Sequence, residues 1–362
     1  MENYIPKEAE ILYEQADAKY DIDEYDAAIE LLTKAINICP VYDRAYNLRG
    51  LAKRNLKEYK AAIEDYSMAI KFNPQYANAY YNRGYAKNEL DDDNGAIIDF
   101  NKAITLDSSN DRFFRWRGAS KENLKLYNEA IEDYSMAIKI NPENGTYYNI
   151  RGRVKEKQGL YKEALKDYDK AISLTTDDDY FFYKRGYVKQ KLKDYKGAIE
   201  DFSKAILLDP EDSDYYKLRG FLRINTYDFT GGVEDYSKAI SLSPVESVSE
   251  IYEERSSLRS LLIQDKKGAI EDINHAISLK PDEGKYYRLR ADIYFSLDNF
   301  QVAINDYTKA IALNPSDGDA YYGRGLVKIS TKNDKSARTD WEMAAELGNT
   351  QAVESIKDFF SA

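Results

Sequence analysis

Apolar positions in the stretch from 59 to 72 recur every three or four residues, the spacing of one face of an α-helix. They are Ala62, Ile63, Tyr66, Ala69 and Ile70. The segment AAIEDYSMAIKFNP at residues 61–74 returns almost unchanged as EAIEDYSMAIKINP at residues 129–142. A proline closes most copies, at Pro40, Pro74, Pro142, Pro210, Pro244, Pro281 and Pro315. These prolines are 34 residues or a multiple of 34 apart, except for one step of 37, and such a period predicts a solenoid.

Each copy predicts two helices, which in the second copy span residues 44–56 and 59–72. We call the first helix of a repeat helix A and the second helix B. Pro74 follows the second helix, at a place where proline blocks continuation of a helix. Gly50 and the alanines of the second helix have little or no side chain, so the two helix axes can approach closely.

Ten copies fit between residues 9 and 349, after an N-terminal extension of residues 1–8. A capping helix is predicted over residues 350–362, because the last copy would otherwise leave an apolar face uncovered. The eighth copy, at about 245–281, contains three additional residues, and this insertion predicts either a tolerated loop or a hinge. The apolar residues of the predicted capping helix are Ala352, Ile356, Phe359 and Phe360.

The repeated positions resemble those of the tetratricopeptide repeats, a family with an aromatic residue, Gly, Ala, an aromatic residue, Ala and Pro at fixed steps. The second copy meets this pattern with Tyr46, Gly50, Ala62, Tyr66, Ala69 and Pro74. The resemblance implies an all-α fold, a right-handed superhelix of antiparallel helix pairs. It also implies a concave groove, lined by the first helix of each pair, that binds peptides or helices.

The chain departs from the family pattern by carrying Arg just before the Gly position and Asp just before the second aromatic position. The first copy lacks both residues, with Gln15 and Leu31 in their places, which suggests that the two contact each other. We therefore predict a structural ladder of Arg–Asp pairs between the two helices; ligand binding by these arginines is the alternative. The pairs are Arg49–Asp65, Arg83–Asp99, Arg117–Asp133, Arg151–Asp167, Arg185–Asp201, Arg219–Asp235, Arg255–Asp272, Arg290–Asp306 and Arg324–Asp340.

Composition argues against catalysis. With one His and one Cys, a nucleophilic triad that uses His is nearly excluded, and no phosphate-binding Gly loop or metal motif is present. We expect Cys39 to be a partly exposed thiol in a closing turn and His275 to be solvated. No enzymatic activity and no cofactor are expected, and the absence of a signal peptide or a long apolar run favours a cytoplasmic protein with no membrane insertion.

The remaining candidate site is the groove that the family resemblance implies. Its expected residues differ from copy to copy, as specific recognition of a partner requires, although drift at unselected surface positions gives the same pattern. They are Arg44, Asn47, Leu51, Asn78, Tyr81, Tyr85, Arg112, Arg115, Asn149, Arg153, Tyr180, Tyr183, Tyr187, Lys217 and Phe221.

These residues predict a non-catalytic scaffold that binds a peptide or protein segment in the groove. The arginines suit an acidic partner, and the tyrosines suit an apolar or aromatic anchor. One alternative is a structural protein that self-assembles through its end repeats or outer face. Another is a helical repeat that binds RNA, which the net charge of −11 opposes, so no nucleic acid partner is expected.

Overall fold

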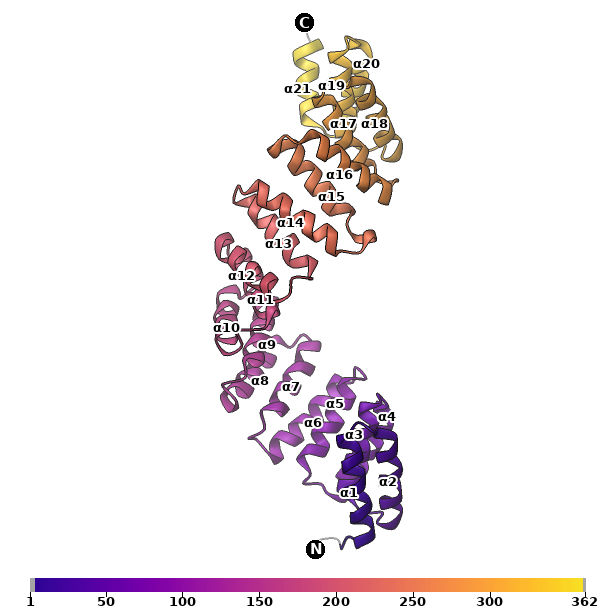
Figure 1. The fold of residues 1–362 in the computed structure, drawn as a ribbon, viewed down its shortest axis with the longest axis vertical. Helices are drawn as coiled ribbons and strands as arrows, with labels where there is room; N and C mark the ends of the chain where they lie inside the picture. The colour runs from indigo at the N-terminus through magenta and orange to yellow at the C-terminus, as the bar shows by residue number, and fades with distance from the viewer. Residues whose placement is uncertain (1–3, 361–362) are drawn as a thin grey trace. The chain divides into compact units, whose positions relative to one another are not determined.

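The computed structural model describes residues 4–360, which form only helices and no strand (Figure 1). The all-α prediction is therefore confirmed for these residues. Residues 1–3 of the predicted extension and residues 361–362 of the predicted capping helix lie outside the described residues. The chain divides into an N-terminal unit, residues 1–192, and a C-terminal unit, residues 193–362.

In the N-terminal unit, consecutive helices pair as α1 with α2, α3 with α4, and so on to α10, and each pair packs on the next. Odd-numbered helices are the A helices and even-numbered helices are the B helices. The bounds are α1 (Lys7–Asp21), α2 (Tyr25–Ile38), α3 (Asp43–Asn55), α4 (Tyr59–Phe72), α5 (Ala77–Asn88), α6 (Asp93–Leu106), α7 (Asp111–Asn123), α8 (Tyr127–Ile140), α9 (Gly145–Lys157), α10 (Tyr161–Leu174) and α11 (Asp179–Lys191).

The C-terminal unit begins with the B helix of the sixth repeat and continues through four further pairs and a last single helix. Its helices are α12 (Tyr195–Leu208), α13 (Ser213–Asn225), α14 (Phe229–Leu242), the 3₁₀ turn η1 (Val245–Ser247), α15 (Ser249–Leu258), the π-helix η2 (Arg259–Ile263), α16 (Lys266–Leu279), α17 (Gly284–Ser296), α18 (Phe300–Leu313), α19 (Gly318–Ser330), α20 (Asp334–Glu346) and α21 (Thr350–Phe360).

Small residues let the two helices of a repeat pack closely. In the second repeat Ala62, Tyr66 and Ala69 are completely buried. A Cβ atom added to Gly50 would lie 2.6 Å from Cε1 of Tyr66, which is closer than real Cβ contacts. The ring of Tyr66 therefore occupies the space that the missing side chain leaves, and glycine is required there by close approach rather than by backbone conformation.

In each repeat, a residue in the left-handed conformation follows the end of helix A within three residues and turns the chain toward helix B. In the third repeat this residue is Asp91, with a φ of 60°, and the amide of Asp92 then donates to the carbonyl of Lys87 at 2.9 Å. The side chain of Asp92 accepts from the amide of Gly95 and caps the start of α6. A short turn thus closes one helix and starts the next.

The eighth repeat holds its additional residues in two places. Two of them fall around η1, before α15, and one falls within η2, after α15. Ser256 stands at the position that Gly50 occupies in the second repeat, and its hydroxyl donates to the carbonyl of Ala269 at 2.8 Å. Ile273 replaces the aromatic residue of helix B and is completely buried.

The last helix, α21, packs on α20 at the end of the C-terminal unit. Trp341 is completely buried there, and the rings of Phe359 and Phe360 lie 5.6 Å and 5.9 Å from it. Ile356 and Phe360 are partly buried against the same cluster, while Phe359 remains 60% exposed. The apolar face of α21 thus covers the end of the last pair.

Candidate functional site

Arginine and aspartate side chains pair along each unit at the ladder positions. In the second repeat Nε of Arg49 donates to Oδ2 of Asp65 at 2.9 Å, and Nη2 donates to Oδ1 at 2.6 Å. The same two contacts, at 2.5 to 2.9 Å, join Arg83–Asp99, Arg117–Asp133, Arg151–Asp167, Arg219–Asp235, Arg255–Asp272, Arg290–Asp306 and Arg324–Asp340. Arg185 belongs to the N-terminal unit and Asp201 to the C-terminal unit; Nη1 of Arg185 lies 2.9 Å from Oδ1 of Asp169.

Each ladder arginine also contacts the preceding repeat, which the sequence analysis did not predict. Nη1 of Arg49 donates to the hydroxyl of Thr33 at 3.0 Å, and Nη1 of Arg83 donates to that of Ser67 at 3.1 Å. A lysine one turn further along helix A adds a second cation, since Nζ of Lys53 lies 2.8 Å from Asp65. The ladder arginines are thus engaged by helix B of two repeats, so a ligand must use other positions of helix A.

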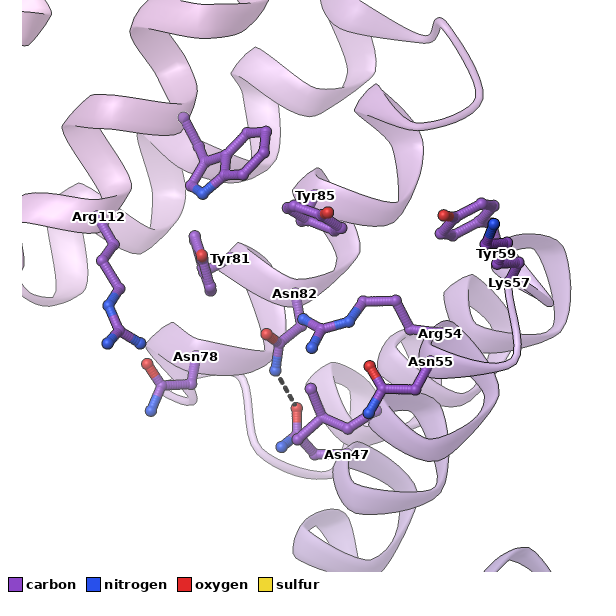
Figure 2. A pocket seen from close by; sticks show the side chains of 12 residues that line it. Asn47, Arg54, Asn55, Lys57, Tyr59, Asn78, Tyr81, Asn82, Tyr85 and Arg112 are labelled. Atoms are coloured by element: carbon purple, nitrogen blue, oxygen red, sulfur yellow. Dashed lines mark hydrogen bonds between the residues drawn. The ribbon is translucent and has the colours of Figure 1, made fainter. Parts of the chain in front are cut away.

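One such set of positions forms a pocket of about 620 Å³ in the N-terminal unit, which we call the Asn47 pocket (Figure 2). It lies along the A helices α3, α5 and α7, with the turn between α3 and α4 at one end. Six of its lining residues were predicted as groove residues: Asn47, Leu51, Asn78, Tyr81, Tyr85 and Arg112. Six others were not: Arg54, Asn55, Lys57, Tyr59, Asn82 and Trp116.

Two buried amides lie at the base of the Asn47 pocket. Nδ2 of Asn82 donates to Oδ1 of Asn47 at 2.9 Å, and each residue is only 6% exposed (Figure 2). This bond uses Oδ1 of Asn47 and Nδ2 of Asn82, so the amino group of Asn47 and the carbonyl oxygen of Asn82 are the atoms that a ligand can engage. A peptide backbone group has the matching donor and acceptor.

Aromatic rings form one wall of the pocket. The guanidinium of Arg54 lies 5.2 Å from the centre of the Tyr85 ring, and the Tyr85 ring meets the edge of Trp116 at 4.5 Å. Burial, together with a hydrogen bond to Glu89, raises the pKa of Tyr85 to about 12. Tyr85 is therefore neutral at physiological pH, and its hydroxyl donates to the carboxylate of Glu89.

The charge of the Asn47 pocket is opposite to that of the whole chain. Arg54, Lys57 and Arg112 line it, and no carboxylate does. None of the three cations has an ion-pair partner among residues 4–360, although the chain carries a net charge of −11. Unpaired guanidinium groups on a pocket wall favour an anionic ligand group.

The other predicted groove residues lie outside this pocket. The guanidinium of Arg44 stacks on Tyr13 at 4.8 Å, and that of Arg115 on Trp116 at 3.7 Å. The rings of Tyr180 and Tyr183 lie 5.9 Å apart, and Nζ of Lys191 lies 5.0 Å from the ring of Tyr187. Lys217 and Phe221 belong to the C-terminal unit, where Phe221 lines a different pocket.

A buried carboxylate that the sequence analysis missed engages Arg153. Glu122 of α7 is 8% exposed and lies 3.1 Å from Nη2 of Arg153 and 2.8 Å from Nζ of Lys157. Burial alone would raise the pKa of Glu122, but Lys157, Arg153 and the hydroxyl of Tyr134 outweigh it, so the pKa is lowered. Asn149, one turn before Arg153 on α9, is also buried. Arg153 is therefore already paired with a neighbouring helix, although its side chain remains 39% exposed.

The signal that could have found Arg54 and Asn55 is helical spacing. They follow Leu51 by three and four residues, so they continue the same face of α3 by one turn. The predicted groove positions end at the residue after the glycine, one turn short of Arg54 and Asn55.

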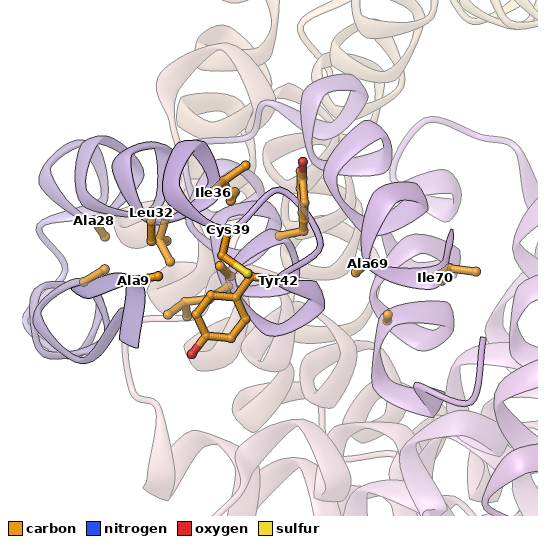
Figure 3. Close-up of a cluster of buried hydrophobic side chains, with 14 residues drawn as sticks. Ala9, Ala28, Leu32, Ile36, Cys39, Tyr42, Ala69 and Ile70 are labelled. Atoms are coloured by element: carbon orange, nitrogen blue, oxygen red, sulfur yellow. The ribbon is translucent and has the colours of Figure 1, made fainter. Parts of the chain in front are cut away.

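The single cysteine and the single histidine are not part of the pocket. Cys39 is 4% exposed and packs in an apolar cluster with Leu32, Ile36 and Tyr42 (Figure 3). The expectation of a partly exposed thiol is wrong, because the closing turn of the first repeat folds against the next repeat. His275 is exposed, and its ring stacks on Tyr252 at 5.0 Å. No group of three His, Cys, Asp or Glu residues suited to a metal ion occurs within residues 4–360.

The geometry defines a helical-repeat protein with a ladder-braced scaffold and variable A-helix surfaces. The chain matches a family model described as a TPR repeat at residues 50–91, 152–193 and 291–329. A second model, the tetratricopeptide repeat, matches residues 9–42, 77–110 and 180–212. Together the matches cover slightly more than half of the chain, and the chain belongs to the tetratricopeptide repeat family.

Solved structures of similar fold include YrrB, described as a TPR protein with an unusual peptide-binding site. It is 24% identical over 50% of this chain and 94% of its own, with a TM-score of 0.45. PilF from Pseudomonas aeruginosa is 18% identical over 60% and 97% of the two chains, with a TM-score of 0.48. Yeast Tom70 is 17% identical over 97% and 95%, with a TM-score of 0.41. A search of curated proteins gives no match. Within residues 4–360, every helix is too short or too polar to cross a lipid bilayer.

Proposed function

We propose that this protein is a non-catalytic scaffold that binds an extended, acidic segment of a partner protein in the Asn47 pocket. The observation that supports this is the set of three unpaired cations beside two fixed amides and an aromatic wall. In the proposed complex, carboxylates of the segment pair with Arg54 and Arg112, and its backbone bonds to Asn47 and Asn82. An apolar or aromatic side chain packs on Tyr81 and Trp116.

A peptide fits this surface better than RNA does. RNA binding needs a continuous basic stripe that follows many phosphates, whereas the Asn47 pocket has three cations within an acidic chain. Membership of the tetratricopeptide repeat family agrees with a protein partner, because the groove of such repeats generally receives peptides or helices.

The test uses a phage-displayed library of random 12-residue peptides, selected on the whole protein. We expect the recovered peptides to contain Asp or Glu next to an aromatic or aliphatic residue. Synthetic versions should bind the Arg54→Glu, Arg112→Glu double variant at least about tenfold more weakly, because two attractive contacts become repulsive. Fluorescence anisotropy measures this loss.

The matched control reverses two charges elsewhere on the same unit. Lys34 and Lys60 are exposed on the B helices α2 and α4 and make no ion pair among residues 4–360. The Lys34→Glu, Lys60→Glu variant changes the net charge equally and should bind as the wild type does. Equal weakening in both variants would mean that only the overall charge matters. Salt-sensitive retention of single-stranded RNA that the Arg54→Glu, Arg112→Glu change abolishes would replace the peptide by RNA.

A further inference from the structure

The eighth repeat ends its A helix differently from every other repeat. In nine repeats the left-handed residue comes seven positions after the small residue that faces helix B; in the third, Asp91 follows Gly84. In the eighth repeat it comes eight positions after Ser256, at Gln264, with a φ of 61°. The closing hydrogen bond spans six residues instead of five, from the amide of Asp265 to the carbonyl of Arg259 at 2.8 Å. One added residue has therefore converted the end of the helix into a π-helix.

This change brings three consecutive apolar side chains to the surface. Leu261, Leu262 and Ile263 are 74%, 49% and 37% exposed. The equivalent stretch of the third repeat is Asn88, Glu89 and Leu90, which is mostly polar. Adjacent exposed leucines are unfavourable in water unless something covers them, and single-residue π insertions occur often at functional sites.

The exposed leucines line a pocket of about 470 Å³ in the C-terminal unit, which we call the Leu261 pocket. Leu258, Leu261 and Leu262 form one side, and Phe221 and Ile224 of α13 form the other. Phe221 is itself 46% exposed. A concave apolar surface of this size accommodates a bulky aliphatic or aromatic side chain.

The polar rim of the Leu261 pocket is acidic. Glu253 and Glu254 of α15 line it, and no lysine or arginine does. Glu253 pairs with Lys285 at 2.7 Å, but Glu254 is exposed and has no ion-pair partner among residues 4–360. The carboxylate of Glu254 accepts from the hydroxyl of Tyr236 and has no cation beside it among the described residues, so it can pair with a cation that arrives with the ligand. The acidic rim also disfavours an anionic lipid surface.

We propose that the Leu261 pocket is a second binding site, which takes a peptide segment with a bulky apolar residue next to Lys or Arg. The apolar side chain fills the space between α13 and the π-helix, and the basic side chain pairs with Glu254. This segment is opposite in charge to the one proposed for the Asn47 pocket, so one partner segment cannot satisfy both. The insertion in the eighth repeat thus creates a recognition surface.

The same 12-residue phage library tests this site on the whole protein. We expect a second group of peptides with Leu, Phe, Met or Trp beside Lys or Arg. The Leu261→Ser variant should bind synthetic versions of these peptides at least about tenfold more weakly, as measured by fluorescence anisotropy. Leu261 is exposed enough for the variant to fold. The Glu254→Lys variant should show a similar loss of affinity for the same peptides. Peptides that carry Glu in place of the basic residue should bind this variant, because the charges are then opposite again.

Two controls separate this site from other effects. Leu207→Ser removes an equally exposed leucine, 73% exposed on α12 of the same unit, and should leave binding unchanged. The Arg54→Glu, Arg112→Glu variant should also bind these peptides normally, so failure at one site is distinguishable from failure at the other. Recovery of no peptide that depends on Leu261 would overturn the proposal. A dimer in sedimentation experiments that Leu261→Ser dissociates would overturn it too, because a second copy would then be the occupant.

Discussion

The third and eighth repeats share one scaffold and differ in the surface that they present. Both hold a ladder pair, with Arg83 bound to Asp99 and Arg255 bound to Asp272 at nearly equal distances. The third repeat supplies polar and aromatic residues to the Asn47 pocket. The eighth supplies leucines and carboxylates to the Leu261 pocket. The ladder residues therefore hold each repeat in place, whereas other residues of helix A can differ from repeat to repeat.

The largest effect should come from removing a ladder carboxylate. Asp99→Ala and Asp272→Ala should each lower the free energy of unfolding by about 3–5 kcal/mol, because two cations are left partly buried without a partner. Urea unfolding followed by circular dichroism measures the loss. Glu271→Ala removes an exposed carboxylate next to Asp272 and should cost less than about 0.5 kcal/mol. A loss in one repeat only would show that the ladder is not equivalent in the two.

The next effect concerns the small residue that faces helix B. In Gly84→Ser the new Cβ would meet Cε1 of Phe100 at 2.9 Å, so overpacking should cost about 1–3 kcal/mol. The eighth repeat has serine there together with Ile273 in place of the ring. In a double-mutant cycle, Gly84→Ser and Phe100→Ile should together cost about 0.5–3 kcal/mol less than the sum of the single changes. Simple additivity would mean that the eighth repeat tolerates serine for another reason.

A smaller effect is expected from shortening the π-helix. Deletion of Leu262 should restore the usual turn, with the left-handed residue seven positions after Ser256, and change the free energy of unfolding by less than about 1 kcal/mol. Binding of basic apolar peptides should be lost, while acidic peptides bind as before. A destabilisation above about 3 kcal/mol in urea would show that the fold itself needs the π-helix.

The repeated positions made the fold predictable, because every copy offers independent evidence for the same helix pair. The spacing also located each Arg and Asp that the structure brings within hydrogen-bond distance. The added contact to Thr33 or Ser67 was missed, although the partner of every ladder arginine at that position is a short polar residue, Thr, Ser, Asn or Asp, that can accept a hydrogen bond.

The candidate site was only partly predictable. The family resemblance places Asn47, Tyr81 and Arg112 along the groove, but it does not say where a long side chain ends. Arg153 lies on a similar face of α9 and yet pairs with the buried Glu122, since a carboxylate from a neighbouring helix is within reach. The repeat spacing predicts an insertion in the eighth repeat, but the Leu261 pocket depends on the π-helix, which no spacing rule indicates.

The smallest expected effect is a difference in acid sensitivity between the third and eighth repeats. The eighth repeat has an ion pair between Glu250 and Lys280, and its hydrogen bond lowers the pKa of Glu250 to about 2. The third repeat has the uncharged Asn78 at the equivalent position, six residues before Gly84. The pKa of Glu250 is lower in the folded chain than the value of about 4.3 in the unfolded chain, so the ionised carboxylate stabilises the fold above about pH 4.3. This contribution to the free energy of unfolding is lost as the pH falls toward 2. The side chains of Lys280 and Glu250 are 40% and 46% exposed, so solvent and salt screen the pair and the effect is small. Hydrogen exchange of α15 should therefore accelerate more between pH 5 and pH 3 in the wild type than in Glu250→Gln, after correction for the intrinsic rate. Exchange of α5 should respond equally in both proteins; a change there would mean that the pair acts beyond its own repeat.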